Sequence, residues 1–499
     1  RASEMKKWRA PAAQTYNPAQ ASRGSAKLLI ELTKLSAVRL LALMRAREVS
    51  PVEACAAYLR RAEELNPRLN AIVTFAPDAL DAARAAERLI MCGDDVPPLC
   101  GLPLTIKDTI ATRGLRTTGG TRLFAEYMPT ADAPAVARLR RAGAIILGKT
   151  NASELALDYE SENPVFGRTN NPHDTTRTPG GSSGGAAASV AACLSACDVG
   201  SDLAGSIRIP AHFCGIYGLL PTAGRVPNAG HFPPPEGPMF AHETFGPMAR
   251  SVADLALMFR VLANETSKVE LRHDDAALRG YQFAWYTDDG VAPVTGETKQ
   301  AVEAAAQALS AAGLVAVEAR PPGVARAPDL WLAFFARAVQ RQMCALYAGR
   351  EELAGPLARD MLTRGAETPR QTLDDYLNAW FERDRLRAEL LAWLETTPLI
   401  VAPVGSVPAF PHGARKVSVD GRDVSTWRAF SYAQTFNVFG LPAVSVPIMR
   451  STEGLPIGVQ IVGRPNAESE VLLAARILET ALGGWQTPLA LPTGGRNPL

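Results

Sequence analysis

Two turns rich in glycine and serine lie close together in the chain, and they carry the residues best suited to chemistry. The first is GGSSGG at 180–185, and the second, GSDLAGS at 200–206, follows an alanine-rich apolar run. Glycine lets the backbone approach another group closely, and a serine hydroxyl becomes a nucleophile once a neighbour takes its proton. The two turns therefore predict a site that brings hydroxyls and backbone N–H groups to a reacting atom.

A serine nucleophile needs a base, and the chain offers two kinds. Histidine is the usual base, but we expect His212, six residues after Ser206, to be a packed or surface histidine. The other known base is a neutral lysine. Lys107 follows the apolar segment 102–106, where burial could lower its pKa from about 10.4 toward neutrality. The plain alternative for Lys107 is an ion pair with Asp108 or another carboxylate.

The remaining parts of such a site are also present. Ser182 or Ser183 could pass a proton between Lys107 and Ser206, and the turn at 203–206 could point its N–H groups inward as an oxyanion hole. One such donor is typically worth ~3–4 kcal/mol in the transition state. A rival interpretation makes GGSSGG a phosphate cradle at a helix N-terminus. The Walker pattern would need Gly-Lys-Ser/Thr at its end, which this turn does not have.

The surrounding sequence predicts the elements that must position these residues. A short strand over 102–106, a helix over 132–142 and a strand over 144–148 alternate in the manner of an α/β fold whose sheet is covered on both faces. Ser50 and Glu53 form a capping-box pattern, and this helix is predicted to end at Asn66-Pro67. The proline-rich segment 224–246 is poor in regular structure, which favours a lid or a pocket wall.

Composition restricts the class of protein more than its function. Of 499 residues, 47% are hydrophobic and 20% are charged, which is typical of a soluble globular protein. The net charge of +2 argues neither for nor against nucleic acid, and the chain has no run of 18 apolar residues for a membrane span. We expect the seven cysteines to be reduced, buried thiols in the cytoplasm. Residues 1–26 are expected to be a polar, partly disordered extension without the apolar stretch of a signal peptide.

At this point the sequence resembles the amidase signature family. That family carries a GGSSGG turn, an alanine-rich helix and a segment similar to GSDLAGSIRIPAHFCGIYGLLPT at 200–222, with a lysine in a PxxxKD context, here 103–108. The resemblance extends to GKTNASE at 148–154, ENPVFGRTNNP at 162–172, GPMARSVADLAL at 246–257, FNVFGLPAVSVP at 436–447 and LPIGVQIVG at 455–463. It therefore spans nearly the whole chain beyond the N-terminal extension.

The resemblance implies a fold and a set of site residues. The fold would be a large mixed, mostly parallel central sheet covered by helices on both faces. It would form one domain over 27–499, with N-terminal helices at 27–95, a catalytic core at 96–265 and pocket helices within 266–499. Ser206 would be the nucleophile, Ser182 the bridging serine after a cis peptide bond from Gly181, and Lys107 the base. The backbone N–H groups of the oxyanion hole would belong to Leu203, Ala204, Gly205 and Ser206. Ser183, Asp202 and Arg208 would support the site.

Two residues depart from the family pattern. Ala204 stands where the family often has glycine, which is compatible with the turn only if its φ stays negative or the strain is absorbed elsewhere. Leu220 replaces the usual lysine of GLKPT, which we expect to matter little for the chemistry.

The implied activity is hydrolysis of the C–N bond of small neutral amides through a Ser206 acyl-enzyme, without metal or cofactor. The aromatic side chains within 331–381 and the Pro/Phe/Met loop at 232–240 favour apolar or aryl amides, with carbamates (urethanes) or esters as related substrates. We expect a cytoplasmic monomer or homodimer that binds no nucleic acid and has no membrane span. The alternative is the glutaminase subunit of a tRNA-dependent amidotransferase, although the tyrosine- and arginine-rich segment of such subunits was not found. A catalytically dead scaffold is disfavoured because Lys107, Ser182 and Ser206 are all present.

Overall fold

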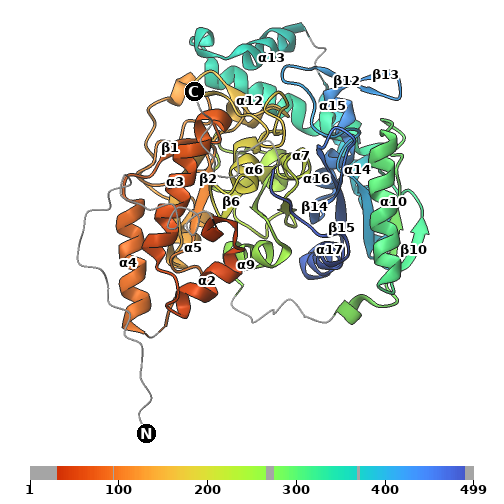
Figure 1. Ribbon diagram of the computed structural model, residues 1–499. Coiled ribbons are helices and arrows are strands. Elements are labelled where there is room, and N and C mark those ends of the chain that lie inside the picture. The colour runs from red at the N-terminus through yellow and green to blue at the C-terminus, as the bar shows by residue number, and fades with distance from the viewer. Residues whose placement is uncertain (1–30, 94, 266–274, 368–370, 489–499) are drawn as a thin grey trace.

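An eleven-stranded β-sheet runs through the part of the chain described by the computed structural model, which comprises residues 31–93, 95–265, 275–367 and 371–488 (Figure 1). In spatial order its strands are β1 (Ile72–Phe75), β3 (Ile145–Thr150), β2 (Pro103–Lys107), β6 (Cys197–Asp202), β8 (Thr244–Ala249), β7 (Tyr217–Leu220), β14 (Ala443–Arg450), β15 (Pro456–Gly463), β11 (Leu399–Pro403), β9 (Gln282–Trp285) and β10 (Val315–Glu318). Two small hairpins pair β4 (Glu162–Asn163) with β5 (Gly167–Arg168) and β12 (Lys416–Val419) with β13 (Arg422–Ser425). The extension predicted over 1–26 lies outside the described residues.

The sheet is mixed, as predicted, but parallel pairing is confined to two groups of strands. β2 pairs in parallel with β3 and β6, and β9 pairs in parallel with β10 and β11. The other six neighbouring pairs are antiparallel. Short connections such as 451–455, between β14 and β15, can join only antiparallel strands. Parallel pairs therefore make up a smaller share of the neighbouring strand pairs than the prediction of a mostly parallel sheet implies.

Helices cover both faces of the sheet. The α-helices are α2 (Ala37–Arg45), α3 (Pro51–Leu69), α4 (Ala79–Cys92), α5 (Pro134–Arg141), α6 (Gly184–Ala191), α7 (Arg208–Cys214), α8 (Pro238–His242), α9 (Val252–Ala263), α10 (Gly296–Ala311), α11 (Ala327–Trp331), α12 (Arg337–Tyr347), α13 (Pro356–Glu367), α14 (Leu373–Leu394), α15 (Thr426–Ala429), α16 (Ser431–Phe439) and α17 (Glu468–Leu482). Short helical turns occupy Arg122–Phe124, Glu154–Ala156, Asp275–Leu278, Leu332–Ala336 and Glu351–Leu353.

Alternation along the strands separates two apolar cores. On β11, Leu399 and Val401 join the core that contains α9, α10 and α17, whereas Ile400 and Ala402 join the core that contains α11, α14 and α16. Because successive side chains of a strand point to opposite faces, this pattern places the two groups of helices on opposite sides of the sheet.

Helix α3 begins as predicted and ends later than predicted. Ser50 and Glu53 form the full capping box, with the Ser50 N–H donating to the Glu53 carboxylate over 3.0 Å. The helix continues through Pro67 to Leu69 and ends where Asn70 adopts a left-handed conformation. Pro67 lies in the last turn, where the missing N–H removes a single hydrogen bond, so it does not end the helix.

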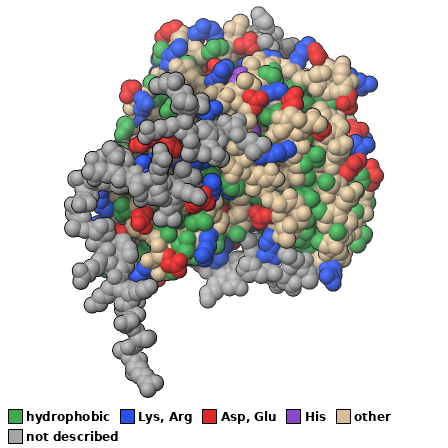
Figure 2. All heavy atoms as spheres, viewed as in Figure 1, with side chains coloured by type: hydrophobic (Ala, Val, Ile, Leu, Met, Phe, Trp, Pro, Cys, Tyr) green, Lys and Arg blue, Asp and Glu red, His purple; other side chains and the backbone are tan. Residues whose placement is uncertain are grey.

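The cysteines are partly as predicted. All seven are free, and five are buried, but Cys92 and Cys344 are exposed. The expectation of burial is wrong for these two because they lie on helices with a solvent-facing side, α4 and α12. Across the described residues, the helices are too short or too polar to cross a lipid bilayer. On the face in Figure 2, Lys and Arg side chains are interspersed with Asp and Glu, which agrees with the small net charge.

Candidate active site

The predicted site residues meet at one edge of the sheet. Lys107 is the last residue of β2, and Asp202 is the last residue of β6. The two strands are parallel neighbours, so their carboxyl ends lie at the same edge. Ser206 lies in the turn between β6 and α7, and Ser182 in the turn before α6. The fold therefore brings a lysine and two serine turns together from distant parts of the chain.

Lys107 contacts the first serine turn directly. Its Nζ lies 2.6 Å from the Ser182 Oγ and 3.0 Å from the Ser201 Oγ. The Lys107 side chain is fully buried, and burial lowers its pKa from 10.5 to about 8 against the attraction of Glu243 and other carboxylates. A substantial neutral fraction near pH 8 is what a lysine base needs.

Asp108 does not pair with Lys107. Its carboxylate accepts hydrogen bonds from the Thr118 hydroxyl and backbone N–H, and burial raises its pKa to about 6 against the attraction of Lys149. Lys149, on β3, donates to the Ile110 carbonyl and to the Thr112 hydroxyl. The plain alternative of a Lys107–Asp108 ion pair is therefore not the arrangement observed.

The first turn has the backbone that the resemblance implies. The peptide bond between Gly181 and Ser182 is cis. A Cβ on Gly181 would lie 2.4 Å from the Asp158 carbonyl oxygen, so only glycine fits this close approach. The adjacent Ser183 donates its N–H to the Ser206 carbonyl over 3.2 Å. Ser183 thus ties the two serine turns together.

The second turn accommodates Ala204 without backbone strain. The positive φ of the turn, 101°, falls on Gly205, whereas Ala204 is not among the residues with positive φ. A Cβ on Gly205 would also lie 2.6 Å from the Ala433 Cβ. Glycine is therefore required at 205, and alanine is acceptable at 204.

One of the four expected oxyanion donors is already engaged. The Gly205 N–H donates to the Asp202 carboxylate over 2.7 Å, which corrects the expectation that it faces a substrate. Within the described residues, the N–H groups of Leu203, Ala204 and Ser206 have no hydrogen-bond acceptor. These three remain the candidate donors to a developing oxyanion.

A buried ion pair fixes the shape of this turn. The Asp202 carboxylate lies 3.1 Å from both Nε and Nη2 of Arg208, and both side chains are fully buried. Arg208 also donates to the side chains of Asn437, over 2.6 Å, and Gln460, over 2.8 Å. Although burial opposes ionisation, Arg208 holds the pKa of Asp202 below its ordinary value. The pair links the turn to α16 and β15.

Arg208→Met should destabilise the protein by about 3–5 kcal/mol, because it leaves the Asp202 carboxylate buried without its charged partner. The measurement is the free energy of unfolding from urea titration at pH 7. The double variant Arg208→Met/Asp202→Asn should recover part of the loss, since no charge then remains buried. Equal losses in the single and double variants would contradict the ion-pair explanation.

Aromatic side chains hold the carbonyl groups of the same turn. Trp331 Nε1 donates to the Leu203 carbonyl over 2.7 Å, and the Tyr159 hydroxyl donates to the Ala204 carbonyl over 2.9 Å. Trp427 packs against both rings, at centroid distances of 4.7 Å and 5.5 Å. The surroundings of the nucleophile turn are therefore largely aromatic.

His212 is not placed as a base. Its Nδ1 accepts from the Gly458 N–H over 2.7 Å, and its Nε2 lies 3.1 Å from the Val407 carbonyl. Burial lowers its pKa to about 4, so the ring is neutral and occupied by backbone groups. The expectation of a packed histidine agrees with this geometry.

Three residues beside Lys107 were not singled out from the sequence: Ser201, His231 and Glu243. Ser201 is part of the GSDLAGS turn, whereas the other two come from the segment 224–246. Pairing of Asp202 with Thr244 and an isolated bridge between Ile110 and His231 bring that segment to the site. The composition of this segment predicted a lid or a pocket wall, but it did not indicate that these side chains reach Lys107.

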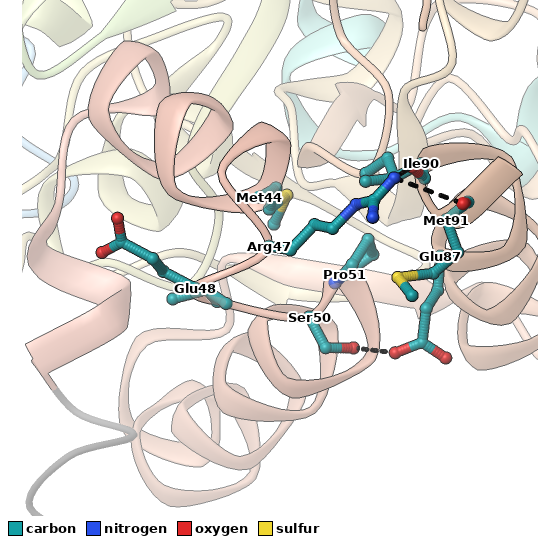
Figure 3. A pocket seen from close by; sticks show the side chains of 9 residues that line it. Met44, Arg47, Glu48, Ser50, Pro51, Glu87, Ile90 and Met91 are labelled. Carbon is teal, nitrogen blue, oxygen red and sulfur yellow. Dashed lines mark hydrogen bonds between the residues drawn. The ribbon is translucent and has the colours of Figure 1, made fainter. Parts of the chain in front are cut away.

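A separate shallow pocket lies between α2, α3 and α4 (Figure 3). Three of its polar side chains bond other lining residues, since the Ser50 hydroxyl donates to Glu87 and Arg47 donates to the Ile90 and Met91 carbonyls. Its lining includes none of the predicted site residues, and these satisfied groups indicate helix packing.

Comparison with known proteins shows which family the chain is similar to. The family model described as Amidase matches residues 53–472. One subunit of the glutamyl-tRNA(Gln) amidotransferase from Thermus thermophilus is 36% identical over 87% of this chain and 94% of its own length. Fatty-acid amide hydrolase 2-A from Danio rerio is 32% identical over 92% of this chain and 90% of its own length. A solved bacterial aryl acylamidase of the amidase signature family has a TM-score of 0.80 at 26% identity, covering 90% of this chain and 96% of that one.

Proposed function

The chain belongs to the amidase family, a group of C–N hydrolases, and from that premise we propose that it hydrolyses small neutral amides carrying apolar or aryl groups. Carbamates (urethanes) and esters are proposed as related substrates. The observation that carries this proposal is the 2.6 Å contact between Lys107 Nζ and Ser182 Oγ, at the edge of the sheet where the Ser206 turn lies. A lysine–serine pair beside a second serine can activate a nucleophile without histidine.

The proposed mechanism passes one proton along the three residues. Neutral Lys107 accepts the proton of Ser182, which takes the proton of Ser206 as the Ser206 oxygen attacks the carbonyl carbon. The oxyanion is stabilised by the free N–H groups of the 203–206 turn. The proton then returns through Ser182 to the leaving nitrogen, and water releases the acid by the same route in reverse. In the structure the Ser206 hydroxyl has no hydrogen-bond partner among the described residues, so its contact with Ser182 would form with substrate bound.

The surroundings of the nucleophile support an apolar substrate. Tyr159, Trp331 and Trp427 enclose the turn, and Met239 joins the same apolar cluster. The solved aryl acylamidase is consistent with such a substrate. The charged α-amino and α-carboxylate groups of free glutamine would be costly to place against aromatic rings without charged partners.

The second candidate is the glutaminase subunit of a tRNA-dependent amidotransferase. It is favoured by the 36% identity to the amidotransferase relative from Thermus thermophilus. Such a subunit would act with partner chains, whereas we propose that this chain acts alone as a monomer or homodimer. We also propose that it works in the cytoplasm without binding nucleic acid, which the seven free thiols and mixed surface charge support.

The test is hydrolysis by the chain alone of matched amides that share one leaving amine and differ in acyl group. We expect kcat/KM to be at least about 10-fold higher for an amide whose acyl group carries a phenyl ring than for a γ-glutamyl amide. An apolar pocket distinguishes such acyl groups by roughly 1–3 kcal/mol of transition-state binding. Carbamates and esters with the same apolar group complete the panel. Trp331→Ala should reduce this ratio. Strong γ-glutamyl hydrolysis, appearing only after addition of a partner subunit, would instead favour the amidotransferase candidate.

A further inference from the structure

A buried chain of polar side chains continues behind Lys107, away from Ser182. Lys107 Nζ lies 3.0 Å from Ser201 Oγ, and this oxygen lies 3.0 Å from His231 Nε2. His231 Nε2 is in turn 2.9 Å from a carboxylate oxygen of Glu243. The side chains of His231 and Glu243 are only 2% and 9% exposed. The proposed mechanism assigns no role to either residue.

The hydrogen bonds fix where the protons of His231 lie. Its Nδ1 is 2.9 Å from the Pro233 carbonyl, which can only accept, so Nδ1 carries a hydrogen. Nε2 faces the Glu243 carboxylate at 2.9 Å, and two lone pairs would repel at that distance. A proton must therefore lie between them. Although burial raises the pKa of Glu243, His231 and then Lys107 hold it below its ordinary value, so Glu243 is the carboxylate of the pair and the shared proton belongs to the imidazole.

Three carboxylates attract a proton onto Lys107: Glu243 most strongly, then Asp202 and Asp198. Arg208 neutralises Asp202 within the buried pair described above. Burial raises the pKa of Asp198 to about 7, so its negative charge is reduced near neutral pH. Glu243 is thus the carboxylate whose charge most needs a partner if Lys107 is to be neutral.

Within the described residues, two further buried charged groups near this edge act mainly on each other. Lys149 and Asp108 attract each other on the neighbouring strand and the loop after β2. Ser201 hydrogen-bonds to the Glu243 carboxylate and accepts an N–H from Lys107, which leaves the single lone pair of neutral Lys107 for Ser182. His231 is the cation that faces Glu243 from the other side.

We propose that His231 is a positioning residue for the base: its ion pair with Glu243 neutralises the carboxylate behind Lys107 and so keeps Lys107 in its proton-accepting form. This proposal rests on the proposed role of Lys107. Removing the imidazolium would leave Glu243 free to hold a proton on Lys107. Removing the carboxylate would do the opposite. The two halves of one ion pair should therefore shift the activation of Ser206 in opposite directions along the pH scale.

The experiment follows the rate at which a short alkyl fluorophosphonate labels Ser206 between pH 6 and pH 10, with the site identified by mass spectrometry. This readout needs an activated serine but no identified substrate. For His231→Gln we expect the acidic limb to move up by about one pH unit, so labelling at pH 7 falls about 10-fold and recovers at alkaline pH. For Glu243→Gln we expect a shift of similar size to lower pH. The double variant should lie close to the unchanged protein.

His212→Gln is the matched control, because His212 is an equally buried histidine that bonds only backbone groups. Its acidic limb should not move. Shifts of the two variants in the same direction, or no shift, would overturn the proposal. If His231→Gln does not fold, Glu243→Gln decides alone, since an unmoved limb is equally contrary. If the limbs shift as expected but no amide is hydrolysed, only the substrate proposal is overturned. If the unchanged protein is not labelled at Ser206, both the proposed function and the role of His231 are overturned.

Discussion

Ser206→Ala should lower kcat for amide hydrolysis by at least about 10⁴-fold, because it removes the oxygen that forms the acyl-enzyme. The other parts of the site remain in place. Lys107 still contacts Ser182, and the turn still offers its N–H groups, so substrate binding should change little. The measurement is single-turnover hydrolysis of the best amide in the panel, together with mass spectrometry for the acyl adduct, which should be absent.

The same substitution should leave the fold intact. Ser206 is 8% exposed, and its hydroxyl has no hydrogen-bond partner among the described residues, so its removal should change the free energy of unfolding by less than about 1 kcal/mol. Ser189→Ala is a matched control, since Ser189 lies in α6 with its hydroxyl 3.0 Å from that of Ser195, and Lys107 bonds Ser182 and Ser201 instead. Activity retained by Ser206→Ala, or lost in Ser189→Ala without unfolding, would contradict the assignment of the nucleophile.

The parts of the site that the sequence predicts are those encoded by contiguous residues. Each serine turn carries its own glycines, and a lysine after an apolar strand is unusual enough to be noticed. The conformation of Ala204 was open from sequence, because a glycine neighbour can take the positive φ. Gly205 does so, and its N–H turns to the Asp202 carboxylate instead of toward a substrate. Such a choice depends on where the carboxylate lies, which a linear pattern does not contain.

The parts that the sequence did not predict come from packing between distant segments. His231 and Glu243 flank a proline-rich loop. Its hydrophobic residues follow no helical or strand period, so the sequence pattern does not indicate the direction of these two side chains. Their positions follow from β8, which pairs with β6 and brings Glu243 beside the end of that strand. Helix α3 continues past Pro67 because one lost hydrogen bond in the last turn is tolerated. Tertiary pairing therefore decides the positions of His231 and Glu243, whereas the end of α3 depends on hydrogen bonds within its own last turn.

Lys107→Met should lower kcat/KM about 10²- to 10⁴-fold, because general-base assistance to Ser206 is lost while the side chain keeps its length. The pH dependence should change as well. In the unchanged protein the base must be neutral, and burial lowers its pKa to about 8. Activity should therefore fall about 10-fold per unit as the pH decreases below 8 and level off above it. The residual activity of Lys107→Met should lack this limb.

Lys107→Met should also change the free energy of unfolding, and near neutral pH this change should favour the variant, in contrast to its loss of activity. Below pH 8 the folded protein buries a charged amine, a cost of up to about 3 kcal/mol for a pKa lowered from 10.5 to about 8. Between pH 8 and pH 10.5 the unfolded chain binds the proton and the folded protein does not, so the stability of the unchanged protein rises with pH over this range. Lys107→Met removes this term and loses two hydrogen bonds. Its stability relative to the unchanged protein should be greater at pH 7 than at pH 10, measured by urea titration.

Lys149→Met distinguishes a specific base from any buried lysine. Lys149 is as buried as Lys107, and burial lowers its pKa to the same value of about 8. Its ammonium group contacts the Ile110 carbonyl and the Thr112 hydroxyl, with neither site serine among its partners. A folded Lys149→Met protein should therefore keep the acidic limb near pH 8. If that limb disappeared with Lys149 and persisted without Lys107, the base would be Lys149, and the proton path through Ser182 would be wrong.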